Sequence, residues 1–176
     1  MTHYETLKSE SMGSYGVVTS RKAARLGIRG FELDRWTKVG KLIKTARGVY
    51  RFADYPMDSE SAAMTAILAE VGEGAYLCGE TALGFMELCP VRSYVATVAT
   101  PNRFRRHVSE GIQVYKGAAG YEPSYYNGVP CQRAADAIRA AVIDGDKREE
   151  AIFAARKAGL ISDAEQAQLN KEFGNG

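Results

Sequence analysis

The sequence predicts an α+β protein in which an N-terminal winged helix-turn-helix (residues 1–56) precedes a mixed α/β domain (residues 57–176) with a small sheet and C-terminal helices. Two observations predict this organisation. The first 56 residues carry the pattern helix, helix, tight glycine-containing turn, helix and β-hairpin, which is the order of elements in a winged helix-turn-helix. The balance of charge also changes sign near residue 56, as is typical of two parts with different partners.

The first two helices are delimited by glycines and a capping residue. Residues 2–12 are expected to form a short helix, which the glycine-containing stretch 13–16 ends. Thr19 is a natural N-cap, because its hydroxyl can accept a hydrogen bond from a free N–H of the first turn. A two-turn helix over residues 20–26 follows, and Gly27 is a typical C-terminal stop.

The third helix leads directly into a hairpin. Residues 30–39 are expected to be helical, and Leu33 and Trp36 share the apolar face because they lie three residues apart. Then KLIKTARGVYRF (residues 41–52) shows two apolar-rich runs around an Arg-Gly pair, the pattern of a β-hairpin. This hairpin carries four cations and no acid.

The charge of the chain is unevenly distributed. Residues 1–56 hold 11 Lys and Arg against 5 Asp and Glu, a balance of +6; residues 57–176 hold 12 against 16, a balance of −4, and the two add to the net charge of +2. Each Lys or Arg that lies against a nucleic-acid backbone releases a condensed counterion. We therefore expect residues 1–56 to bind double-stranded DNA. Cations that only protect a strand edge are the alternative.

The candidate DNA contacts form two groups. Side chains expected to reach base edges lie at the start and on the outward face of the third helix: Arg29, Phe31, Arg35 and Lys38. For Phe31, contact with a thymine methyl group and packing beneath the first helix are both open, and Asp34 is expected to pair with Lys38. Side chains expected to contact phosphate lie at the start of the second helix and along the hairpin: Thr19, Ser20, Lys41, Lys44, Arg47 and Arg51.

The second domain begins after the proline-containing stretch 54–59. Helices are expected up to about residue 71 and over 79–88, then strands at 93–100 and 111–117, and helical segments at 133–144, 147–159 and 162–173. The loop between the two strands contains NRFRRH. Its arginines form either a second polyanion-binding patch or a solvated loop: Arg103, Arg105 and Arg106.

Several classes of protein are not favoured by the sequence. No run of about 18 apolar residues suits a membrane span, and MTHYETLKSE lacks the apolar stretch of a secretory signal. The three cysteines (Cys78, Cys89, Cys131) show no CxxC spacing and have only His3 and His107 beside them. Free thiols in a reducing cytoplasm are therefore expected instead of a zinc site. No catalytic residue, metal or other cofactor is expected.

The stretch 16–52 resembles the N-terminal winged helix of the AbiEi-type antitoxins and transcriptional regulators of type IV toxin–antitoxin systems. The matching features are a Gly-hydrophobic-hydrophobic-Thr start, a Gly-hydrophobic turn, a basic helix ending in Gly, and a hairpin closing on Gly-Val-Tyr: residues 16–19, 27–28, 30–40 and 48–50. YLCGETALGFMEL (76–88) and GVPCQRAADAI (128–138) are similar to later segments of the family. The resemblance covers about residues 13–145.

The resemblance implies a transcriptional autorepressor that binds inverted repeats in its own promoter. It also implies that residues 57–176 oppose a nucleotidyltransferase-like toxin of an abortive-infection system, without the need for a stable complex. Arg133 and Asp136 are expected to form a structural pair. Two other functions stay open: a stand-alone winged-helix regulator without a toxin partner, and a metal-dependent nuclease, for which Glu110 and Lys116 are the best residues available.

Overall fold

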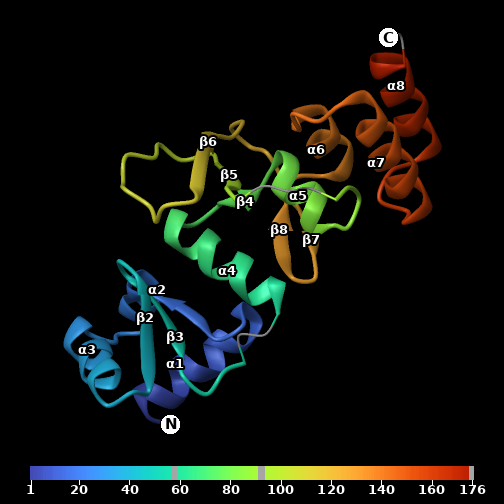
Figure 1. The fold of residues 1–176 in the computed structure, drawn as a ribbon. Coiled ribbons are helices and arrows are strands. Elements are labelled where there is room, and N and C mark those ends of the chain that lie inside the picture. Colours follow the sequence, from blue (N-terminus) through green and yellow to red (C-terminus); the bar gives the residue numbers. More distant parts are fainter. Residues whose placement is uncertain (57–58, 91–93, 175–176) are drawn as a thin grey trace. The chain divides into compact units, whose positions relative to one another are not determined.

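The computed structural model describes residues 1–56, 59–90 and 94–174. This part of the chain combines helices with two small sheets (Figure 1), so the predicted α+β class is confirmed. It divides into two compact units. The first contains residues 1–73 together with the short stretches 106–109 and 127–129, and the second contains the remainder.

The first unit is built from short elements that follow one another closely. In chain order they are α1 (His3–Ser11), the 3-10 turn η1 (Met12–Ser14), β1 (Val17–Thr19), α2 (Ser20–Arg25), α3 (Gly30–Lys38), β2 (Leu42–Ala46), β3 (Val49–Phe52) and α4 (Glu60–Val71). The helices expected at 2–12, 20–26 and 30–39 and the hairpin at 41–52 are confirmed. The strand β1 was not predicted.

The three strands form an antiparallel sheet in the order β1-β3-β2. Side chains alternate between the two faces of a strand. On β3, Tyr50 and Phe52 therefore share one face, and Val18 and Leu42, their partners on β1 and β2, lie on the same face. These side chains join Leu7 of α1, Ala23 of α2, and Leu33 and Trp36 of α3 in one buried cluster.

The opposite face of this sheet is covered by α4. Val17 of β1 and Val49 of β3 belong to this face and are 3% and 2% exposed. The helix α4 contacts both β1 and β3. The compact units accordingly divide after Glu73, whereas the sequence placed the boundary at residue 56. The physical reason is that the second apolar face of the sheet needs a covering layer, which this alanine-rich helix supplies.

The second unit contains a five-stranded mixed sheet and four helices within the described residues. Its elements are β4 (Tyr76–Leu77), α5 (Gly79–Phe85), β5 (Ala96–Thr100), β6 (Ile112–Lys116), β7 (Ser124–Tyr126), β8 (Val129–Cys131), α6 (Ala134–Ala140), α7 (Gly145–Lys157) and α8 (Asp163–Phe173). The strand order is β6-β5-β4-β8-β7. β4 pairs antiparallel with β5 and parallel with β8, and β5 pairs parallel with β6.

The helix expected over residues 133–144 ends early, at Ala140. Ala141 adopts an extended conformation, and the guanidinium of Arg148 donates to the carbonyl oxygens of Ile138, Ala141 and Ile143. These bonds satisfy acceptors at the helix end that have no intrahelical partner. The strands β4, β7 and β8 were also not predicted. Each has three residues or fewer.

The position of α4 leads to a prediction on truncated chains. A fragment of residues 1–73 should unfold cooperatively, whereas a fragment of residues 1–56 should lose much of its stability, because Val17 and Val49 would then face water. Circular dichroism during thermal unfolding gives the midpoint and the cooperativity of unfolding for each fragment. Equal midpoints for the two fragments would contradict the assignment of α4 to the first unit.

Candidate nucleic-acid interface

The start of α3 is fixed to α1 through one carboxylate. Arg29 occupies the N-cap position, and its backbone N–H donates to Glu32 Oε2 at 3.0 Å. The other carboxylate oxygen, Oε1, lies 2.9 Å from His3 Nδ1 of α1. The hydrogen bond from the Arg29 backbone, followed by that from His3, holds the pKa of Glu32 below its ordinary value. The side chain of Arg29 itself is exposed.

The outward face of α3 presents the residues that the sequence placed there. Leu33 and Trp36 are buried, and at 100° per residue Phe31, Arg35 and Lys38 fall on the opposite side of the helix. Phe31 is 60% exposed, so it does not pack beneath the first helix. Asp34 shares this face, but the structure gives it no ion pair with Lys38 or any other described residue.

Because side chains alternate between the two faces of a strand, the cations of the hairpin lie on different faces of the sheet. Lys44 pairs with Tyr50, and its Nζ lies 6.0 Å from the centre of that ring, on the face that carries α1–α3. Lys41 lies near the same helices, with its Nζ 4.8 Å from the centre of the Tyr4 ring. Arg51 instead pairs with Ile43 and belongs to the face covered by α4. The structure therefore does not bring Arg51 together with Lys44.

The turn of the hairpin lies against the start of α2. Gly48 has a φ of +73°, and its carbonyl accepts a 2.9 Å hydrogen bond from the Ser20 backbone N–H. This contact places the exposed Ser20 beside the turn that carries the exposed Arg47, although the two residues are distant in the sequence. The hydroxyl of Thr19 accepts from the Lys22 N–H at 3.1 Å, so Thr19 acts as the N-cap of α2.

The cations of this unit differ sharply in how they are neutralised. Those on α1 and α2 are each paired with an acid: Lys8 with Asp54, Lys22 with Glu10, and Arg21 and Arg25 with Glu73. Those from the start of α3 to the end of β3 form no ion pair with any residue in the described ranges: Arg29, Arg35, Lys38, Lys41, Lys44, Arg47 and Arg51. Within residues 1–56, the cations without an ion pair thus lie in one continuous segment, residues 29–51.

The arginines of the 102–107 loop have different environments. Arg106 donates to the carbonyl oxygen of Val71 at 2.5 Å and so satisfies the C-terminal end of α4. Arg103 and Arg105 are exposed. The two compact units divide between Arg105 and Arg106, and Arg106 has a structural role that the sequence did not indicate.

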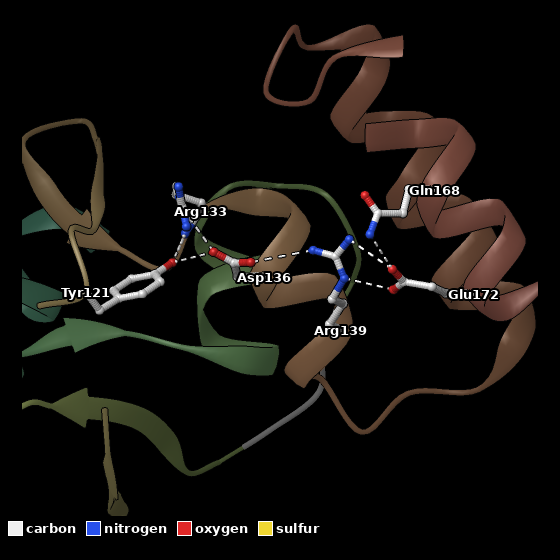
Figure 2. Close-up of polar contacts among 6 residues, drawn as sticks. All are labelled: Tyr121, Arg133, Asp136, Arg139, Gln168 and Glu172. Carbon is white, nitrogen blue, oxygen red and sulfur yellow. Dashed lines mark hydrogen bonds and ion pairs between the residues drawn. The ribbon is translucent and has the colours of Figure 1, made fainter. Parts of the chain in front are cut away.

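In the second unit, a chain of polar contacts joins α6 to α8 (Figure 2). Arg133 Nε and the hydroxyl of Tyr121 both donate to Asp136 Oδ2, at 3.1 and 2.9 Å, which gives the pair expected between Arg133 and Asp136. Arg139 lies 3.5 Å from the other Asp136 oxygen and donates to both oxygens of Glu172 at 2.8 and 3.2 Å. This network is structural, because it links one element to the next.

The three cysteines, all within the described residues, are buried and form no disulfide. Burial raises the pKa of Cys78 to about 11 and that of Cys131 to about 12, so neither is a thiolate at neutral pH. Within the described residues, no group of three or more His, Cys, Asp or Glu is arranged to hold a metal ion. The helices described here are also too short or too polar to span a membrane.

Two residues that shape this surface were missed by the sequence analysis. Glu32 fixes the start of α3, and Tyr4 packs edge-to-face against both Trp36 and Phe52 while contacting Lys41. For Glu32 a local signal was present, since an acid at the third helical position commonly bonds the N-cap backbone. For Tyr4 there was none, because its partners are distant in the sequence.

Comparison with known proteins shows a weak structural likeness. No protein-family model matches the chain, and no curated protein matches it. Among solved structures, the crystal structure of the RV2827C protein from Mycobacterium tuberculosis is similar with a TM-score of 0.41 and 10% identity, covering 96% of this chain and 81% of that one. A likeness at this level carries no argument about function.

The contact between Arg139 and Glu172 leads to a prediction on acid stability. Arg139 holds the pKa of Glu172 below its ordinary value of 4.5. Glu172 thus stabilises the fold above that value, and the contribution is lost as the pH falls through its lowered pKa. Glu172→Gln should therefore reduce the decrease in melting temperature between about pH 5 and pH 3.

The exposed Glu149 of α7 provides the matched control, because it forms no ion pair with a described residue. Glu149→Gln should leave the pH dependence as in the unmodified chain. If Glu172→Gln behaves in the same way as Glu149→Gln, the contact between α6 and α8 does not contribute to stability.

Proposed function

We propose that the first unit is a winged helix-turn-helix that binds double-stranded DNA, with α3 in the major groove and the β2–β3 hairpin against the phosphate backbone. The order α1, β1, α2, α3, β2, β3 supports this proposal, because it is the element order of that motif. The observation that carries it is that, among residues 1–56, the cations of the segment 29–51 form no ion pair with a described residue, while the cations of α1 and α2 are paired with acids.

Electrostatics explain why this distribution favours a polyanion. Clustered like charges repel one another, so a cluster without acids destabilises the folded state unless a partner neutralises it. DNA neutralises each such cation and releases a counterion. Edge protection of a strand, the alternative, accounts for Lys44 on β2 but not for Arg35 and Lys38 on a helix.

The residues then divide by role. Arg35 and Lys38 on the outward face of α3 are proposed to donate to base edges, with Arg29 at the start of the helix, and Phe31 to contact a thymine methyl group. Lys41, Lys44, Arg47 and Ser20 are proposed to contact phosphate and set the register. Arg51 and Thr19 are left out, because one lies on the other face of the sheet and the other is used as a helix cap.

For the whole chain we propose a DNA-binding transcriptional repressor. Promoter inverted repeats as its target, and opposition of the second unit to a nucleotidyltransferase-like toxin, are supported only by the resemblance of residues 13–145 to the AbiEi-type antitoxins. The stand-alone regulator remains the alternative. The nuclease alternative has no cluster of metal-binding side chains to build on in the described residues.

Arg35→Ala tests base contact. A duplex selected from a randomised pool by the full chain serves as the specific sequence, and a random duplex as the reference. We expect Arg35→Ala to lose about 1–3 kcal/mol of discrimination between the two, measured by mobility shift. Arg25→Ala removes a cation that Glu73 already pairs and should leave the discrimination unchanged. Equal weakening of both duplexes by Arg35→Ala would rule out base contact by this residue.

Lys44→Ala tests phosphate contact by the hairpin. The plot of log affinity against log salt concentration should become shallower by about 0.9, because one fewer counterion is released. Arg51→Ala removes the same charge from the opposite face of the same hairpin and should leave the slope unchanged. Identical slopes for the Lys44→Ala variant and the unmodified chain would mean that the hairpin does not lie on the backbone.

A further inference from the structure

Among the described residues, the longer edge strand of the five-stranded sheet, β6, is paired on one side only. It lies at one end of the strand order, and β7 lies at the other (Figure 1). β7 has three residues and offers little edge for pairing, whereas β6 has five. Natural proteins commonly protect such an edge with a proline, a bulge or charges along the strand. β6 has no proline, pairs with β5 without a break in register, and carries a single charge, Lys116, at its last position.

The backbone groups that point away from the sheet belong to alternate residues of β6. The Ala96 N–H of β5 donates to the carbonyl oxygen of Gly111 at 2.7 Å, and Ala96 pairs with Ile112 in the register. In a parallel pair, every second residue of a strand bonds the neighbouring strand, so the odd-numbered residues of β6 bond β5. Ile112, Val114 and Lys116 therefore direct their N–H and C=O groups outward. These groups form no hydrogen bond with any residue that the structure describes.

A second copy of β6 matches this edge in an antiparallel register. About a two-fold axis at Val114, Ile112 of each copy lies opposite Lys116 of the other, and the two Val114 residues lie opposite each other. All of these are hydrogen-bonded pairs, because every residue involved directs its backbone groups outward. Each outward N–H thus meets an outward C=O of the other copy. The arrangement is closed, since each β6 then has a neighbouring strand on both sides.

The side chains of β6 suit the same register. Lys116 and Glu110, which lies two residues before the strand, are exposed and form no ion pair with a described residue. Because Lys116 lies opposite Ile112 of the other copy, Glu110 of that copy is its diagonal neighbour, within reach of a long side chain. On the other face of the strand, the exposed Gln113 lies opposite Tyr115, which is 46% exposed. The charges at the two ends of the strand are therefore complementary to those of a second copy.

We propose that β6 pairs antiparallel with β6 of a second copy of this chain, so that the two five-stranded sheets form one continuous sheet about a two-fold axis. The partner is the chain itself and not an unrelated extended peptide, because one register both satisfies the outward backbone groups and brings Lys116 to Glu110. The inference does not depend on DNA binding by the first unit.

Sedimentation equilibrium of the full chain tests the proposal. We expect an equilibrium between monomer and dimer with a dissociation constant in the micromolar range, because the contact is small. Lys116→Glu and Glu110→Lys each place like charges together and should weaken dimerisation about tenfold, since the contact occurs twice across the axis. The double variant exchanges the two charges and should restore the dissociation constant of the unmodified chain. Lys157→Glu, which reverses an exposed cation of α7, is the control and should have no effect.

Val114→Cys tests the register directly. Residues of a hydrogen-bonded antiparallel pair have Cα atoms about 5.5 Å apart, a separation that suits a disulfide. Mild oxidation of this variant should link two copies, seen as a dimer on a non-reducing gel. Ile112→Cys is the matched control, because its two thiols would lie about 13 Å apart along the paired strands and could not bond. The native cysteines are buried and should not react.

Three results would overturn the proposal. The first is a monomer at every concentration. The second is a dimer whose dissociation constant does not change in Lys116→Glu and Glu110→Lys, or is not restored in the double variant. The third is cross-linking of Ile112→Cys as readily as Val114→Cys, which would place the contact in another register or on another surface.

Discussion

The pairing of β3 between β1 and β2 is the constraint on which the first unit depends. Because successive side chains of a strand point to opposite faces, this one central strand fixes both layers. Tyr50 and Phe52 enter the core with the three helices, and Val49 enters the contact surface of α4. The same alternation sorts the cations, so that Lys44 lies with the helices and Arg51 does not. The pairing of β3 and the alternation of its side chains thus determine both which residues form the hydrophobic core and which face of the sheet carries each cation.

The two sets of cations in this unit show that charge alone does not define an interface. Lys8, Arg21, Lys22 and Arg25 add as much to the net charge as any others, but neighbouring acids neutralise them. What distinguishes the segment 29–51 is that its cations have no such acids within the described residues. The two acids of this segment leave these cations unpaired. Glu32 accepts from the Arg29 backbone N–H and contacts the His3 ring nitrogen Nδ1, and Asp34 forms no ion pair with a described residue.

Much of the first unit could be predicted from the sequence because its signals are local. Thr19 as a cap, Leu33 and Trp36 on one helix face, and the Arg-Gly turn each depend on residues close in the chain. What could not be predicted depends on distant partners. β1 is strand only because it pairs with β3, and α4 carries no sequence mark of the sheet that it covers. In the second unit, the packing of Tyr76 against Ala99 and Tyr121 was missed for the same reason, since these residues are distant in the sequence.

The central claim is that DNA lies on the outward face of α3 and on the hairpin. Hydrogen exchange of the full chain, with and without a duplex, measures this directly along the backbone. Protection by DNA should be confined to residues 29–48 and the first turn of α2, with the rest of that cationic but paired helix unchanged. Protection of the second unit alone, or equal protection of α2 and α3, would contradict it.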